Sequence, residues 1–212
     1  MQIRETFRRA FETARVALNS RCHEDAHFHI RGDVFITLRD GATGKVQDYR
    51  EIRNLVVRDA SILIARLLKD NSESPYGVFC LAVGTGDTGW DPMNPPAPTD
   101  TQRALYSELA RKAFSATTFI DSGGSPTAVP TNVVDYSATF AEGEANGPLC
   151  EMGLLGGNIV ISPPNPVSPP NGPYNVPPVN LTEYETEINY TTFACVNKPP
   201  TSTMTVVWRL TT

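Results

Sequence analysis

The residues best suited to chemistry lie in one short stretch, CHEDAHFHI, which holds every histidine of the chain. His27 and His29 are two residues apart, so on a strand they would share one face. Imidazole nitrogens and a thiolate are ligands for zinc and other transition metals, which makes His23, His27, His29 and Cys22 the candidate metal ligands. The alternative is a polar linker between an N-terminal helix and the first strand. We favour the linker and therefore expect no metal and no other cofactor.

No catalytic constellation is present in the sequence. There is no G-x-S-x-G nucleophile motif. The segment GTGDTG at 84–89 lacks the Lys-Ser/Thr ending of a phosphate-binding loop, and a proline-rich stretch follows it. Asp87 and Asp91 are too loosely spaced for a calcium loop, and no glutamate completes the set. We expect no catalytic residue and a protein that is not an enzyme.

Three charged residues, Glu108, Arg111 and Glu151, stand beside segments that are expected to be buried strands. An unpaired charge is costly in such a place. We therefore predict a structural ion pair in which Arg111 binds either Glu108 or Glu151, locking a turn or a seam between subunits.

Aromatic residues mark candidate surfaces for contact between subunits. Trp90 and Tyr106 flank a proline-rich loop. Packing between subunits is a common role for such residues, although an exposed aromatic loop could also bind carbohydrate. The predicted oligomer contacts are Phe7, Phe11, Trp90 and Tyr174.

Composition limits the classes of partner. Charged residues make up 19% of the 212-residue chain, below the roughly 25% typical of globular domains. The net charge of −5 argues against a nucleic-acid-binding protein, whose binding surface is basic. Only the N-terminal stretch is locally basic, either as a solvated helix face or as an arm that docks on an acidic partner.

The four cysteines form no C-x-x-C motif, so a zinc ribbon is not expected. Cys80 and Cys150 lie in apolar stretches and are predicted to be buried as small apolar side chains. Cys22 and Cys195 could pair between subunits in an oxidising exterior. With neither a signal peptide nor an apolar run of about 18 residues, we expect synthesis in a reducing cytoplasm and no membrane partner.

Hydrophobic periodicity predicts a mainly β (α+β) fold with a β-sandwich-like body. A hairpin is predicted over 33–57 and a buried strand over 78–83, with more strands over 114–121 and from 133 onward. Apolar stripes predict an amphipathic helix at 2–18, a short helix at 59–69, and a helical turn around Leu105 and Leu109.

The predicted organisation is an N-terminal helical arm, 1–26, followed by a β-rich body, 27–212. A proline-rich insertion at 163–178 cannot join a sheet and is predicted to be extended. It is either an exposed loop or a rigid arm lying on a neighbouring subunit. The last strand closes the chain, which suggests that the C-terminus is tied into a sheet.

An ordered set of short segments carries a resemblance to known proteins. NLVVRDASILIARLLKD leads into GVFCLAVGTGDT, and TDTQRALYSELARK, SATFAEGEANGPLCEMGLL and a terminal TVVWRLT follow. This order resembles tailed-bacteriophage virion proteins of the tail, collar or fibre-associated type. The resemblance covers roughly residues 54–155 and the last strand, and leaves out CHEDAHFHI and the proline-rich insertion.

The resemblance implies a structural component of a virion, present in several copies at the tail, the neck or collar, or the fibre-attachment region. Its partners would be other copies of itself and other virion proteins. Two alternatives remain: a capsid decoration protein, and a receptor- or carbohydrate-binding module at a tail tip.

Overall fold

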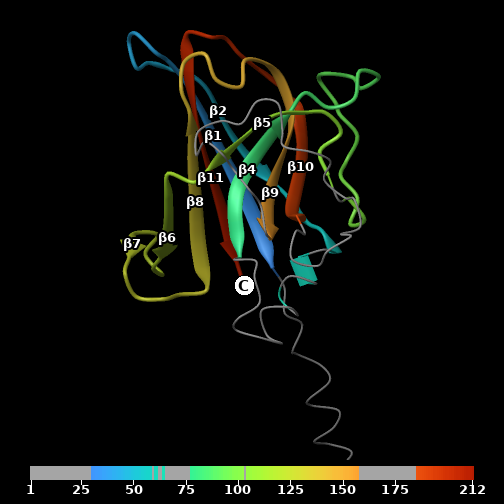
Figure 1. Ribbon diagram of the computed structural model, residues 1–212. Helices are drawn as coiled ribbons and strands as arrows, with labels where there is room; N and C mark the ends of the chain where they lie inside the picture. The colour runs from blue at the N-terminus through green and yellow to red at the C-terminus, as the bar shows by residue number, and fades with distance from the viewer. Residues whose placement is uncertain (1–29, 59, 62–63, 65–76, 103, 158–184) are drawn as a thin grey trace, which may run out of the picture.

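The computed structural model describes residues 30–58, 60–61, 64, 77–102, 104–157 and 185–212. These residues form two antiparallel sheets that pack face to face (Figure 1). The strands are β1 (Arg31–Asp40), β2 (Val46–Arg53), β3 (Leu55–Val56), β4 (Val78–Gly84), β5 (Glu108–Ala113), β6 (Ala116–Ile120), β7 (Pro126–Thr127), β8 (Val133–Phe140), β9 (Gly147–Gly157), β10 (Glu185–Lys198) and β11 (Ser202–Thr211).

The six-stranded sheet has the order β2-β1-β11-β8-β6-β7, and the five-stranded sheet has the order β3-β10-β9-β4-β5. The expected mainly β fold is therefore confirmed. The predicted hairpin over 33–57 corresponds to β1, a turn and β2, followed by a step at Asn54 into β3 of the other sheet. The chain end is held as expected, because β11 is a central strand and the Thr212 amide donates to the Asn132 carbonyl at 3.0 Å.

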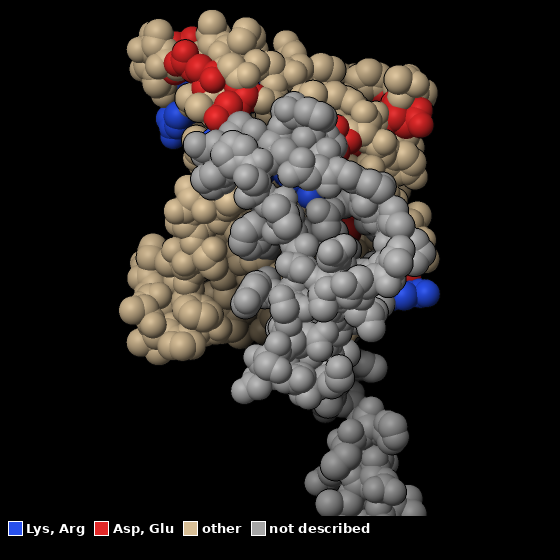
Figure 2. All heavy atoms as spheres, in the orientation of Figure 1, with Lys and Arg blue, Asp and Glu red and all other residues tan. Residues whose placement is uncertain are grey.

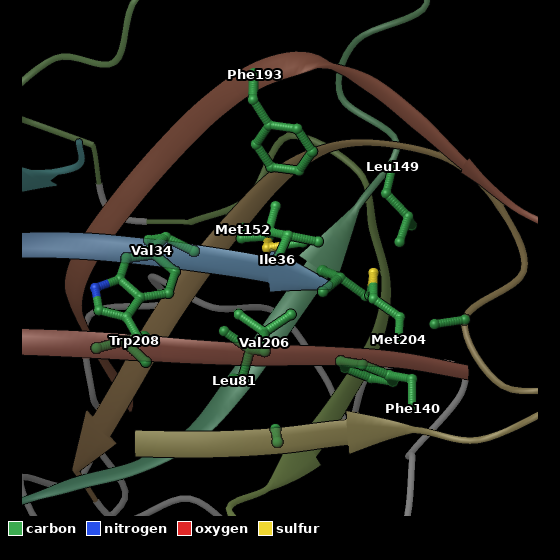
Figure 3. Packing of buried hydrophobic residues seen from close by; sticks show 14 of the residues in the cluster. Val34, Ile36, Leu81, Phe140, Leu149, Met152, Phe193, Met204, Val206 and Trp208 are labelled. Atoms are coloured by element: carbon green, nitrogen blue, oxygen red, sulfur yellow. The ribbon is translucent and has the colours of Figure 1, made fainter. Parts of the chain in front are cut away.

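The core lies between the two sheets. Alternate residues of β11, including Met204, Val206 and Trp208, point inward, as the period of two of a strand requires. They meet inward-facing residues of the other sheet such as Leu81 and Met152 (Figure 3). This apolar interior fixes which face of each strand is buried, and with it the positions of the polar residues on the opposite faces.

The five-stranded sheet is buried on both of its faces. Residues 151–156 of β9 are all buried, unlike the alternating residues of β11. A second apolar cluster, which includes Ala82, Leu155 and Tyr190, lies on the face turned away from the other sheet. Polar side chains on this outer face are therefore shielded from solvent.

Two expectations about helices have different outcomes. The helical turn predicted around Leu105 and Leu109 is wrong: Leu109 lies in β5, and Leu105 lies in the preceding irregular segment. A β-bulge shifts the register between β4 and β5 at Val83 and Gly84, next to Glu108. Most of the helix predicted at 59–69, the N-terminal arm at 1–26 and the proline-rich segment at 163–178 lie outside the described residues.

Candidate functional site

A long irregular loop, residues 85–107, joins the neighbouring strands β4 and β5 and rises at one end of the sandwich (green in Figure 1). Its two ends meet, because the Thr85 amide donates to the Ser107 carbonyl at 2.9 Å. We refer to this segment as the display loop, and to the place where its ends meet as its neck.

Glu151 of β9 holds the neck of the display loop. Its carboxylate is fully buried and accepts four hydrogen bonds. Three come from backbone amides: Gly86 at 3.1 Å, Tyr106 at 2.9 Å and Ser107 at 2.8 Å. The fourth comes from the Tyr190 hydroxyl of β10, at 2.6 Å. Hydrogen bonds to a charged acceptor are among the strongest in proteins, so this one side chain ties both ends of the loop to two strands.

The glycines of the GTG segment make room for this arrangement. A Cβ atom on Gly84 would lie 2.4 Å from a carboxylate oxygen of Glu151. Gly86 has a φ of +71°, and a Cβ there would lie 2.4 Å from the Trp90 ring. The glycines therefore serve close packing at the neck.

Arg111 pairs with Glu108, one of its two expected partners. The guanidinium donates to both carboxylate oxygens, at 2.7 and 3.0 Å, and the side chains are 0% and 2% exposed. Glu151, the other expected partner, binds the loop amides and Tyr190 as described above. Sequence reasoning anticipated that the three charges would be buried but missed Tyr190, since its hydroxyl meets Glu151 only through the pairing of β9 and β10.

The electrostatics of this cluster are most evident at Tyr190. Burial raises the pKa of its hydroxyl well above the ordinary value of 10.0, and the negative charges of Glu151 and Glu187 raise it further. Tyr190 therefore remains a neutral hydrogen-bond donor. This role is structural, because the residue lies within the packed outer cluster of the sheet.

The display loop is fixed along its length as well as at its neck. The Cys195 amide donates to the Pro92 carbonyl at 2.7 Å, and the Thr192 hydroxyl donates to the Pro96 carbonyl at 2.6 Å. On the return path, the Arg58 amide donates to the Asp100 carbonyl at 2.9 Å. The loop is therefore an ordered surface supported by β10.

The cysteine prediction is corrected at the same place. Cys150, expected to be a simple buried thiol, forms a disulfide with Cys195, so β9 and β10 are covalently joined. The apolar setting of Cys150 indicated burial correctly but could not identify a partner from 45 residues away. Cys80 is buried, as expected.

Apolar side chains stand out on the display loop. Met93 is 77% exposed and Tyr106 is 59% exposed, whereas Trp90 is half-buried and meets Tyr106 edge-on with ring centroids 4.9 Å apart. The nearby carboxylates bind the loop itself: Asp87 accepts from the Gly89 amide at 2.7 Å, and Asp91 accepts from the Met93 amide at 2.9 Å. The arrangement thus presents aromatic and apolar surface on a rigid support.

In the part of the chain that the structure describes, no three His, Cys, Asp or Glu side chains gather into a candidate metal site. Several predicted residues cannot be placed, because they lie outside that part: Cys22, His23, His27, His29, Phe7, Phe11 and Tyr174.

Within the described ranges, no helix has the length and apolar character needed to cross a membrane. Comparison with protein-family models and with curated proteins finds no match to this chain.

Proposed function

We propose that this protein is a structural, non-enzymatic component of a tailed-phage virion, present in several copies at the tail, neck or fibre-attachment region. The observation that carries the proposal is the Glu151 clamp. Its charge is buried against backbone amides and a tyrosine, and the result is a rigid loop that presents apolar surface. Together with the resemblance of segments 54–155 to virion proteins, this arrangement suits a contact between subunits.

The charge distribution supports the same proposal. On the face shown in Figure 2, acidic side chains of the described residues gather at the upper left and the upper right, whereas the tan surface at the lower left bears no charge. Uncharged surface costs little to desolvate when subunits pack together. In this proposal the arms, with Phe7, Phe11 and Tyr174, supply further contacts alongside Trp90.

The proposal also covers the segment that connects β3 with β4. β3 and β4 are consecutive in the chain, yet β10 and β9 stand between them in the sheet. The connection therefore has to cross or bypass those strands, whose outer face carries Leu155 and Tyr190. We assign a helix to residues 59–69; Ala60, one residue of its apolar stripe, is buried in the core between the sheets.

A second function is favoured by one specific observation, the exposure of Tyr106 beside Trp90 on a loop that also exposes Met93. A tail-tip module that binds a receptor or carbohydrate could use this aromatic surface. Trp90→Ala would then abolish adsorption of particles to host cells while leaving particle assembly intact. In the structural role, the same change would lower the yield of complete particles.

Immunogold labelling of purified particles tests the main proposal. An antibody raised against the described sandwich is expected to label the tail or the neck. Uniform labelling of the head would instead identify a capsid decoration protein. Absence of label, together with absence of the protein from disrupted particles, would contradict the virion assignment.

A further inference from the structure

β2 is an edge strand of the six-stranded sheet, and among the described strands it pairs only with β1. The free side of an edge strand carries backbone N–H and C=O groups that can pair with another strand. β2 is 8 residues long, and its side chains Val46 and Tyr49 are 44% and 58% exposed. No strand of the described residues covers this edge, which is long enough to accept a further strand.

The sequence of β2 is self-complementary in the antiparallel register centred on Tyr49, which also pairs most of the strand. Two copies that pair antiparallel are related by a twofold axis perpendicular to the sheet, so each side chain stays on its own face and one residue lies on the axis. An axis through Asp48, Arg50 or Glu51 would place two like charges opposite each other. An axis through Tyr49 instead places Tyr49 against its own copy.

In the register centred on Tyr49, the neighbouring charges also match. Asp48 of each chain faces Arg50 of the other, so two oppositely charged pairs form around the axis. Within one chain these two side chains already form an ion pair at 3.0 Å, and they are 35% and 29% exposed. The Arg50 guanidinium also donates to the Ala194 carbonyl, which holds it at the edge of the sandwich.

We propose that two copies of this chain associate through β2, pairing antiparallel about Tyr49 and joining their six-stranded sheets into one. Addition of a strand to a sheet edge draws its affinity from main-chain hydrogen bonds and its register from the side chains, here the Asp48–Arg50 pairs. This inference rests on the proposed function, since it names the partner surface for assembly into several copies.

Charge complementation tests the register directly. The Asp48→Arg chain presents two arginines at the interface, and the Arg50→Asp chain presents two aspartates. In a homodimer of either variant, like charges would face each other across the interface. The dimer dissociation constant of each variant is therefore expected to rise roughly 100-fold. An equimolar mixture of the two restores opposite charges at both pairs and is expected to form a heterodimer. Sedimentation velocity on wild type, each variant and the mixture provides the measurement.

Controls separate the interface from folding. Val129→Lys adds a charge at a residue that is 68% exposed and lies off β2, and it should leave the dimer unchanged. Because Arg50 also binds Ala194, circular dichroism and the unfolding midpoint of each variant are compared with those of wild type. If Arg50→Asp fails to fold, Tyr49→Lys replaces it by placing two ammonium groups on the axis, and it should give monomers.

The outcomes distinguish this inference from the proposed function. A wild-type protein that remains monomeric at its highest soluble concentration would overturn the β2 dimer, and so would folded variants that all still dimerise. In either case the presence of the protein in particles would leave the proposed function standing. A β2 dimer that never enters particles would support the inference and contradict the proposed function.

Discussion

The buried carboxylate of Glu151 is stabilised by three backbone amides and the phenol of Tyr190. It is the hydrogen-bond acceptor for all four of these donors. Glu151→Gln keeps the size of the side chain but points an amide N–H₂ group at other donors. We expect the free energy of unfolding to fall by about 2–4 kcal/mol, since buried donors lose their acceptor. Urea unfolding measures this loss. The exposed Glu142→Gln is the control and should change stability by less than about 0.5 kcal/mol.

Tyr190 gives the cluster a pH signature. Its pKa is raised in the folded protein, so its contribution to stability is fully present below pH 10.0, the ordinary pKa of an unfolded tyrosine. Above that pH the unfolded chain loses the proton while the folded chain retains it. Stability should therefore fall by about 1.4 kcal/mol per pH unit from this residue.

Tyr190→Phe removes this titration. The variant should be less stable than wild type at neutral pH, because the hydrogen bond to Glu151 is lost, but its stability should decline less steeply with pH. Urea unfolding at several values between about pH 9 and pH 11 compares the two slopes. Equal slopes in wild type and variant would contradict a raised pKa at Tyr190.

The display loop depends on the glycine at its neck. Gly86→Ala would place a methyl group against the Trp90 ring, on a backbone that already has a positive φ. Gly143 is a matched control, since its φ is +78° and no atom lies within 4 Å of its added Cβ. Both variants bear the backbone penalty of about 1 kcal/mol. Only Gly86→Ala should also shift the Trp90 fluorescence, and an unchanged spectrum would contradict the close packing of Trp90 on the neck.

The disulfide between β9 and β10 stabilises the pairing of these two strands. It closes a loop with a sequence separation of 45 residues, which corresponds to up to about 4 kcal/mol in the chain-entropy description. Reduction should lower the unfolding midpoint of wild type. The Cys150→Ser/Cys195→Ser double variant should start near that lowered value and be insensitive to reductant. If reductant also lowered the unfolding midpoint of the double variant, the effect on wild type could not be assigned to the Cys150–Cys195 disulfide.

Local pattern predicted the strands well and the contacts between them poorly. β11, with its strict alternation, and β4, with its apolar run, were recognisable because their own residues determine which faces are buried. β5 was mistaken for a helical turn because Leu105 and Leu109 are four residues apart, while the pairing with β4 that makes the segment a strand involves residues distant in the chain. Glu151 was identified as a buried charge, but its loop donors are 44–65 residues away in the chain.

For the whole molecule, two packed sheets, a covalent link between β9 and β10 and a clamped display loop make a rigid body suited to repeated assembly. The proposed virion role combines this rigidity with the resemblance to phage proteins, and β2 supplies an edge through which two copies can join. The central claim is therefore that the protein is a building block of a particle.

Quantitative mass spectrometry of gradient-purified particles tests this claim most directly. The account predicts that the protein co-purifies with the major capsid and tail proteins at a fixed ratio of several copies per particle. A protein that is absent from the particles and remains in the lysate as a free monomer would contradict it.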